Sequence, residues 1–298
     1  MNGEKYLIIV GGATATGKTD MAIRLAERFE TEILSADSRQ FYREMSIGTA
    51  KPSAAQLSAV KHHFIDHRSI HDVYNVGEYE REALGVLEQL FEDKQYVVMV
   101  GGTGLYIQAV CEGLDEFPAV PLAVRHELEG VFAREGIGAL QRELAVVDPV
   151  YYSQVDVRNA VRLIRALSVS RVSGAPFSSF QGRERKARFF TPLYFNLSVD
   201  RGVLYERINR RVDVMIEMGL LDEARGLIEF RYLNALQTVG YQELFDYFDG
   251  VVDLEWAVGL IKQHTRNYAK RQVTWFGKGG WERVLDFDEI VFRCLSEL

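Results

Sequence analysis

Short apolar runs alternate with longer amphipathic segments over the first hundred residues. Residues 6–10, 33–36 and 96–100 are mostly apolar and have the length of buried strands. After the first run, apolar residues such as Leu25 and Phe29 recur at helical spacing. Strands that alternate with helices predict a parallel sheet with helices on both faces, and ligands then bind at the carboxyl ends of the strands.

The pattern changes in the middle of the chain. Strand signals stop near residue 115 and return at residues 189–199, and the remainder is again helical in its periodicity. We therefore expect an α/β core with C-terminal helices, formed by residues 1–114 and 189–298. Residues 115–188 are expected to form an inserted helical domain.

Composition places the chain among ordinary globular proteins. Its 298 residues are 47% apolar and 26% charged, enough for one large domain or two smaller ones. The two cysteines cannot form a disulfide framework and lack metal-site spacing, which favours a reducing cytoplasm. The longest early apolar run is too short for a signal peptide or a membrane span. We expect a cytoplasmic monomer with no membrane partner.

Charge is distributed unevenly. The net charge of −7 argues against a generally basic nucleic-acid binder, but residues 158–188 hold eight basic side chains and one acidic. Residues 262–278 hold five basic side chains and no acidic one. Within these segments, two sets recur at helical spacing: Arg158, Arg162 and Arg165, and Lys262, Arg266 and Lys270. A charged helix face is usually only solvated, but two on an acidic protein favour a polyanionic partner.

A phosphate-binding motif, G-x-x-x-x-G-K-[ST], follows the first predicted strand and opens the first predicted helix. Glycine turns and a helix N-terminus expose backbone N–H groups to phosphate oxygens, the lysine adds a positive charge, and the final hydroxyl suits Mg²⁺. A glycine turn without a ligand is the alternative. The motif predicts a P-loop-type sheet and leaves open which phosphate compound binds. The expected phosphate-binding residues are Gly12, Ala13, Thr14, Ala15, Thr16, Gly17, Lys18 and Thr19, the last also as metal ligand.

One carboxylate is expected beside this loop. Asp37 follows the second predicted strand and suits a metal ligand or a general base, although Asp before Ser is also a common turn or helix cap. The third strand ends in Gly101-Gly102-Thr103-Gly104, where an NTPase usually has its Mg²⁺-binding acid. An Asn-Lys-x-Asp motif is also missing, which argues against a GTPase.

Nine ordered blocks extend from the phosphate loop to the last basic segment. They are GGATATGKT (11–19), SADSRQFY (35–42), IGTAKP (47–52), HHFID (62–66), GGTGLY (101–106), RNAVRLIRAL (158–167), RINRRVDVM (207–215), GYQE (240–243) and TRNYAKRQVTWF (265–276). Together these blocks resemble the tRNA dimethylallyltransferases, also called tRNA isopentenyltransferases, in their compact bacterial form, and the resemblance covers nearly the whole chain. Two departures, Ala13 for the usual proline and Phe41 for a smaller aliphatic residue, remove no functional group.

The resemblance implies transfer of a dimethylallyl group from dimethylallyl diphosphate to N6 of adenosine 37 in tRNA. The phosphate loop would then hold a leaving diphosphate with Mg²⁺, and because no phosphoryl group moves, the usual acid is not needed. An adenine amine is a poor nucleophile, so a base must take its proton, and Asp37 is the candidate. By similarity Thr103 would lie near the bridging oxygen, Arg211 would contact the diphosphate, and Ser38 and Gln40 would orient the base.

The target nucleotide must leave the stacked anticodon stem-loop to be modified, and the two cationic sets are expected to hold the tRNA backbone. Three alternatives stay open: an adenylate isopentenyltransferase acting on free AMP or ATP, a small-molecule P-loop kinase, and a non-catalytic RNA-binding protein gated by nucleotide. The helical insertion and the basic C-terminal helix favour RNA, because a small acceptor needs neither.

Four further side chains have structural interpretations. The adjacent His62 and His63 should point apart in a regular element, so we do not expect them to share a metal. Tyr106 and Trp275 are more typical of core residues than of base-stacking platforms.

Overall fold

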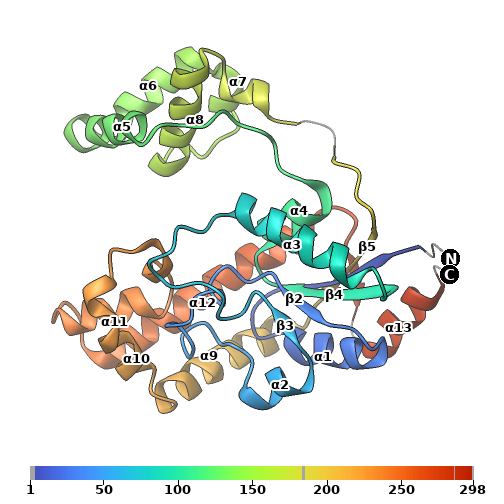
Figure 1. The fold of residues 1–298 in the computed structure, drawn as a ribbon. Coiled ribbons are helices and arrows are strands. Elements are labelled where there is room, and N and C mark those ends of the chain that lie inside the picture. The colour runs from blue at the N-terminus through green and yellow to red at the C-terminus, as the bar shows by residue number, and fades with distance from the viewer. Residues whose placement is uncertain (1–3, 183–184, 285, 297–298) are drawn as a thin grey trace. The chain divides into compact units, whose positions relative to one another are not determined.

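The computed structural model describes residues 4–182, 185–284 and 286–296, and the chain divides into two compact units (Figure 1). The core unit consists of Met1–Glu112 and Ala187–Leu298, and the inserted unit is Gly113–Lys186. Each boundary lies two residues earlier than the expected one. Arg183 and Glu184, which belong to the basic segment at residues 158–188, lie outside the described residues.

The core unit contains a six-stranded sheet in the order β3-β2-β4-β1-β5-β6, and every pairing in it is parallel. The predicted α/β class, a parallel sheet flanked by helices, is confirmed. The edge strands β3 and β6 escaped prediction because they are only two and three residues long and lack an apolar run. The strands are β1 (Tyr6–Gly11), β2 (Ile33–Ser35), β3 (His62–His63), β4 (Tyr96–Gly101), β5 (Thr191–Leu197) and β6 (Glu282–Val284).

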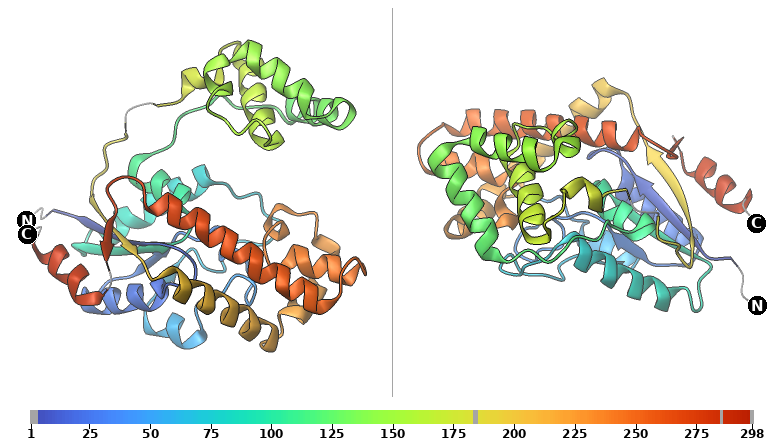
Figure 2. Two further views of the ribbon diagram at one scale, coloured as in Figure 1. Left: turned by 180° about the vertical axis from the view of Figure 1, so that it is seen from behind. Right: turned by 90° about the horizontal axis from the view of Figure 1, so that it is seen from above.

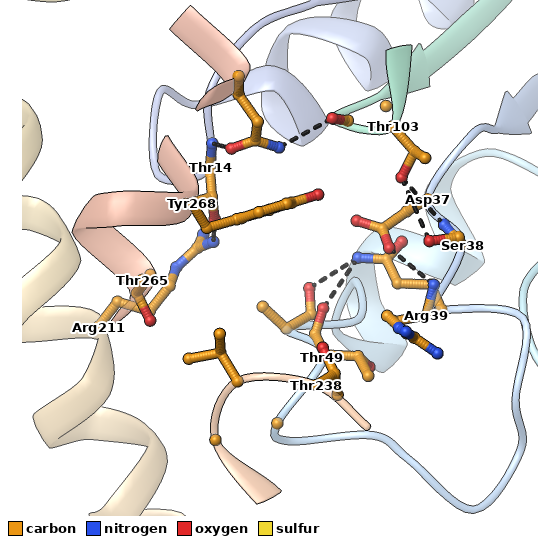
Figure 3. Close-up of a pocket in the computed structure, with 18 of the residues that line it drawn as sticks. Thr14, Asp37, Ser38, Arg39, Thr49, Thr103, Arg211, Thr238, Thr265 and Tyr268 are labelled. Atoms are coloured by element: carbon orange, nitrogen blue, oxygen red, sulfur yellow. Dashed lines mark hydrogen bonds between the residues drawn. The ribbon is translucent and has the colours of Figure 1, made fainter. Parts of the chain in front are cut away.

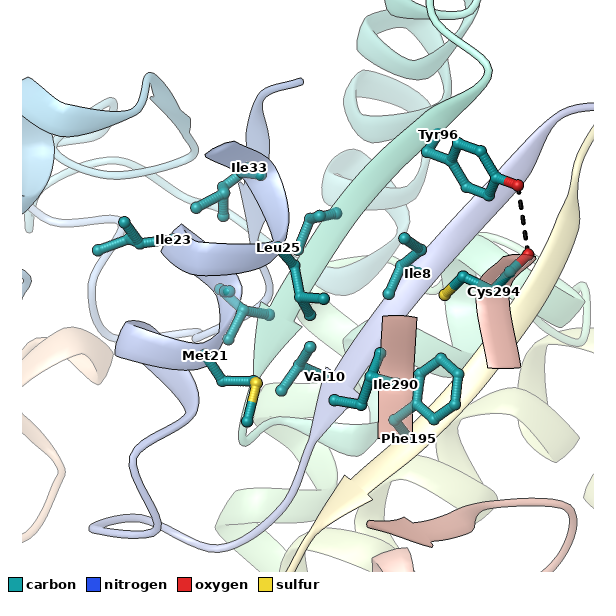
Figure 4. Packing of buried hydrophobic residues seen from close by; sticks show 14 of the residues in the cluster. Ile8, Val10, Met21, Ile23, Leu25, Ile33, Tyr96, Phe195, Ile290 and Cys294 are labelled. Carbon is teal, nitrogen blue, oxygen red and sulfur yellow. Dashed lines mark hydrogen bonds between the residues drawn. The ribbon is translucent and has the colours of Figure 1, made fainter. Parts of the chain in front are cut away.

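Helices cover both faces of this sheet, as Figure 2 shows from behind and from above. Ile8 and Val10 of β1 pack against α1 (Lys18–Arg28) and α13 (Phe287–Ser296), as Figure 4 shows. The alternate side chains of β1 pack against α3 (Val76–Leu90) and α4 (Gly104–Glu112) on the other face. A strand buried on both faces must be apolar throughout, which explains its sequence. The strand ends are therefore where a ligand can reach the sheet.

A second group of helices packs at the carboxyl ends of the strands. Their apolar faces meet in a separate cluster that includes Val212, Leu220, Leu244 and Ile261. The segments are α9 (Arg201–Glu217), α10 (Leu220–Gly226), η2 (Ile228–Phe230), η3 (Asn234–Leu236), α11 (Tyr241–Phe248) and α12 (Leu254–Phe276), and the short α2 (Ala54–Ala59) precedes β3. Among the described helices, none is both long enough and apolar enough to cross a bilayer.

The inserted unit has a core of its own, built around Leu128, Leu140, Leu163 and Leu167. The buried Asp148 carboxylate accepts hydrogen bonds from the Tyr151 and Ser178 amides and so joins two of its elements. The unit consists of α5 (Leu122–Glu135), α6 (Ile137–Val147), α7 (Pro149–Tyr152), α8 (Ala160–Ser173) and η1 (Phe177–Phe180).

Candidate active site

A cavity of about 560 Å³ lies at the carboxyl ends of three neighbouring strands of the core unit. Thr14 follows β1, Asp37 follows β2 and Thr103 follows β4, and all three line the cavity (Figure 3). Because parallel strands end at the same edge of a sheet, side chains distant in sequence meet here. The predicted residues Ser38, Gln40 and Arg211 line the same cavity.

The phosphate loop has the predicted position between β1 and α1. Gly12 and Gly17 have φ angles of 139° and 95°, which residues with a side chain rarely adopt. A Cβ atom at Gly12 would also lie 2.6 Å from the Leu197 carbonyl oxygen, so β5 and the loop can approach only at a glycine. Of the predicted loop residues, Thr14, Lys18 and Thr19 line the cavity, whereas Gly12, Ala13, Ala15, Thr16 and Gly17 form the backbone behind them.

Lys18 is the cation at the base of the cavity. Its ammonium group donates a hydrogen bond to the Ala13 carbonyl oxygen at 2.5 Å. Burial lowers the pKa of Lys18 from 10.5 to about 8, the charge of Asp37 opposes this fall, and Arg211 adds to it. Arg211 also donates to the Thr14 hydroxyl at 3.3 Å. Two cations beside a glycine loop form a site for an anion, because a bound anion would relieve their repulsion.

Asp37 lies on the opposite side of the cavity from the glycine loop. One carboxylate oxygen, Oδ1, accepts a hydrogen bond from the Arg39 amide at 3.0 Å, which is the turn that the sequence left open as an alternative. Within the described residues no hydrogen bond reaches the other oxygen, Oδ2. The carboxylate can therefore stabilise the turn and still accept a proton from a ligand.

Glycines in the GGTG block let other segments approach the end of β4. Side chains at Gly101, Gly102 and Gly104 would collide with the Ala36 carbonyl group, with Gln272 and with Trp275, respectively. The Gln272 amide donates to the Gly102 carbonyl oxygen and accepts from the Thr14 amide, both at 2.9 Å. Helix α12 thus connects β4 to the phosphate loop, and Thr103 is left facing the cavity.

Thr103 and Ser38 lie side by side, and Tyr268 points toward them from the other side of the site (Figure 3). The Ser38 amide donates to the Thr103 hydroxyl oxygen at 3.2 Å. Burial raises the pKa of Tyr268 to about 12, and the charge of Asp37 contributes to the rise. The phenol of Tyr268 therefore stays protonated at neutral pH and can donate a hydrogen bond into the site.

Another part of the cavity wall, which we call the acceptor side, consists of Gln40 and of the segments 46–50 and 237–240. The Gln40 amide nitrogen donates to the carbonyl oxygens of Thr49 and Ala50 at 3.2 and 3.1 Å. The second segment ends at Gly240, whose amide donates to the buried Glu243 carboxylate at 2.7 Å. Both segments are therefore held by hydrogen bonds close to the cavity.

Sequence reasoning missed that α12 lines the cavity and contacts the glycine loop. Thr265, Tyr268 and Gln272 line the cavity and stand at positions i, i+3 and i+7 of one helix. That spacing places them on one face and could have identified them. Arg39 was also missed, and its guanidinium donates to the carbonyl oxygens of Asn234 and Ala235.

The predicted cationic set on α12 does not form one open face. Lys262 pairs with Asp213 at 2.6 Å, and Arg266 donates to the Asn209 side chain at 2.5 Å, both partners lying on α9. Packing of the two helices half-buries these cations, whereas Lys270 is exposed. Two of the three side chains therefore contribute to helix packing.

The predicted cationic set Arg158, Arg162 and Arg165 is wrong at its first residue, because Arg158 does not belong to α8. The helix begins at Ala160, because the Asn159 side chain caps it by accepting from the Arg162 amide. Arg158 therefore precedes the helix and contacts Asp156 instead. Arg162 and Arg165 are exposed on α8, opposite its buried leucines as predicted.

The remaining aromatic and histidine predictions concern single side chains. Tyr106 packs against Phe41 and Tyr79, as expected of a core residue. Trp275 is 42% exposed, and so it is not a core residue. On β3, His62 contacts the Val60 carbonyl oxygen and His63 contacts Glu32, so the two imidazoles have different partners.

Oxygen donors at the cavity suit a magnesium ion. The Thr19 hydroxyl and the Asp37 carboxylate both line it, and Mg²⁺ usually takes one or two such protein ligands together with phosphate oxygens and water. A group of three or more His, Cys, Asp or Glu side chains that could hold a metal is not found in the part of the chain that the structure describes. The donor set thus fits an ion that a phosphate ligand brings with it.

Comparison with known proteins extends the similarity beyond the phosphate loop. Residues 40–279 match the family model described as IPP transferase. The chain is 51% identical to a tRNA dimethylallyltransferase of Christiangramia forsetii over 284 residues, covering 95% of this chain and 94% of that protein. Identity to the tRNA dimethylallyltransferase of Flavobacterium johnsoniae is 46%, covering 99% and 98%. The fold matches a tRNA isopentenylpyrophosphate transferase from Bacillus halodurans with a TM-score of 0.71 and 36% identity, covering 99% and 95%.

Proposed function

This chain belongs to the IPP transferase family, and on that premise we propose that it transfers a dimethylallyl group from dimethylallyl diphosphate to N6 of adenosine 37 in tRNA. The similar proteins that carry the name tRNA dimethylallyltransferase span both units of the chain. The observation that carries the proposal is the meeting of two cations, Lys18 and Arg211, with the Asp37 carboxylate in one cavity. The cations suit a diphosphate, and the carboxylate suits an amine proton.

The phosphate-loop side would bind the leaving group. As the allylic C–O bond breaks, negative charge grows on the diphosphate, and Lys18, Arg211 and the loop amides stabilise it. Thr19 and the diphosphate oxygens would hold Mg²⁺, whose charge adds to this stabilisation. Thr103, which follows β4 and lines the cavity, would donate a hydrogen bond to the oxygen that leaves.

Asp37 would serve as the general base. The N6–C bond forms as the C–O bond breaks, and the proton displaced from N6 passes to the free Oδ2 atom of Asp37. The lone pair of an exocyclic adenine amine is delocalised into the ring, so attack is slow unless this proton is removed. Gln40 and Ser38, beside Asp37, would orient the adenine.

The tRNA acceptor is favoured over a free nucleotide by the inserted unit. Its exposed Arg162 and Arg165 suit the phosphates of an RNA backbone, and a small acceptor needs no such additional unit. We also propose that the enzyme acts as a monomer, because one chain supplies Lys18, Arg211 and Asp37, the groups that the proposed reaction uses.

The test supplies radiolabelled dimethylallyl diphosphate with Mg²⁺ and offers unmodified tRNA, AMP or ATP as acceptor. Label should enter tRNA, and a matched tRNA with guanosine at position 37 should stay unlabelled because it lacks the N6 amine. Label in AMP alone would indicate the adenylate enzyme. Formation of ADP and of a phosphorylated acceptor from ATP, in place of label transfer, would indicate a kinase.

A further inference from the structure

Glu223, on α10, binds a segment that lies about 175 residues earlier in the chain. Its Oε2 atom accepts hydrogen bonds from the amides of Ser46 and Ile47 at 2.9 and 2.8 Å. Its Oε1 atom accepts from the Gly48 amide at 2.9 Å and from the Tyr241 hydroxyl at 2.6 Å. Three successive backbone N–H groups therefore converge on one carboxylate.

This convergence requires an unusual shape of the segment 46–50. Its backbone turns back on itself, with hydrogen bonds from Ala50 to Ile47 and from Lys51 to Ser46, so that the three amides point outward. Ala50 has a φ of 51°, a left-handed conformation that is unfavourable for alanine. A Cβ atom at Gly48 would lie 2.6 Å from the Tyr241 ring. The shape is thus maintained by its partners, and Glu223 contributes a negative charge to them.

The same segment determines how Gln40 faces the cavity. Both N–H groups of the Gln40 amide donate to carbonyl oxygens of the segment, those of Thr49 and Ala50. The two carbonyl oxygens can only accept, so they fix which end of the amide is nitrogen. Its oxygen, Oε1, is the atom left to a ligand, apart from a long 3.4 Å contact from the Ser35 hydroxyl. Gln40 therefore offers an acceptor, which suits the amino group of an adenine.

We propose that Glu223 is a positioning residue for the acceptor base: its carboxylate holds the segment 46–50, which orients the Gln40 amide. The proposal rests on the proposed function, in which Gln40 contacts the adenine. All the groups bound to Glu223 are donors, so a carboxylate with acceptors on both oxygens is required. Glutamine at this position has the same shape but would direct an N–H group at another N–H group.

The test compares Glu223→Gln with Asp222→Asn, which removes a charge from the neighbouring position on α10. Losing charge-assisted hydrogen bonds should lower kcat/KM for tRNA roughly 10- to 100-fold in Glu223→Gln. The dissociation constant of dimethylallyl diphosphate should not change, because the phosphate loop is untouched. Amide hydrogen exchange at residues 46–48 should become faster in Glu223→Gln, whereas Asp222→Asn should match the wild type in every measurement.

A double-mutant cycle with Gln40→Ala separates positioning from general stability. If Glu223 acts through Gln40, then adding Glu223→Gln to Gln40→Ala should cause little further loss of kcat/KM. Fully additive losses, or unchanged amide exchange at residues 46–48, would overturn the proposal. Should Glu223→Gln fail to fold, Tyr241→Phe removes one donor and keeps the ring on Gly48, and it should show the same changes to a smaller extent.

Failure of the proposed function would look different. A wild-type enzyme that does not label tRNA would overturn the role in positioning an RNA base, even with slow amide exchange at residues 46–48. Normal tRNA labelling by the wild type, combined with additive losses of kcat/KM in the double mutant, would overturn only the proposed role of Glu223 and leave the proposed function intact.

Discussion

The two sides of the cavity are built in different ways. The phosphate-loop side is a run of eight residues, Gly12–Thr19, whose conformation follows from its own glycines and from the helix that it opens. The acceptor side combines Gln40, the segment 46–50 and the segment 237–240, and its shape depends on glutamates from α10 and α11. A site for a common chemical group can be local, whereas a site for one particular base has to be assembled. The following predictions test this division, from the largest expected effect to the smallest.

Asp37 would carry the proton transfer of the proposed reaction, and replacing it should have the largest effect. Asp37→Asn keeps an Oδ1 atom for the Arg39 amide but cannot take a proton, so turnover should fall roughly 10²- to 10⁴-fold with little change in tRNA affinity. Single-turnover transfer of label measures the rate, and filter binding measures the affinity. Asp37→Ala, which also removes the turn, should be no more active. Full activity in Asp37→Asn would show that Asp37 only stabilises the turn and is not the general base.

Lys18→Ala should impair the phosphate-loop side alone. Loss of a buried charge from the anion site should weaken binding of dimethylallyl diphosphate roughly 10- to 100-fold and leave the dissociation constant of tRNA unchanged. Calorimetry with each substrate measures both constants. Arg24→Ala on the same helix is the control, because Arg24 lies over the Phe287 ring. Equal weakening of both substrates would show that the two sides are not independent.

The affinity for dimethylallyl diphosphate should depend on pH through the charge of Lys18. Because the pKa of Lys18 is about 8, the free protein loses this charge above pH 8, and affinity for the diphosphate should fall about tenfold per pH unit there. Lys18→Arg, which stays charged, should bind with a flat profile over that range. The free energy of unfolding should instead rise with pH between about 8 and 10.5, since the unfolded chain then retains a proton that the folded chain has lost. A wild-type affinity that does not vary up to pH 10 would contradict this assignment.

Arg162→Ala should have the smallest effect, confined to tRNA. Removing one phosphate contact should weaken tRNA binding a few-fold and reduce the slope of log affinity against log salt by about one. Arg125→Ala is the control in the inserted unit, because Arg125 pairs with Glu129 on its own helix. If the slope does not change, Arg162 is an ordinary solvated side chain.

The difference between the two sides also explains what could be predicted from sequence. The phosphate loop and the strand that precedes Asp37 were predictable because local residue order determines them. The pocket residues of α12 were not recognised, because the contact of Gln272 with Gly102 and Thr14 is a tertiary one. Arg158 was placed in a helix although Asn159, a strong N-cap residue, marks the start of that helix one residue later.

The bridge between Thr14 and Gln272 also has a consequence for biosynthesis. A growing chain can form the glycine turn soon after its first strand leaves the ribosome, but Gln272, which accepts the hydrogen bond of the Thr14 amide, is made 258 residues later. Synthesis must therefore pass α12 before the nascent protein has a complete binding site.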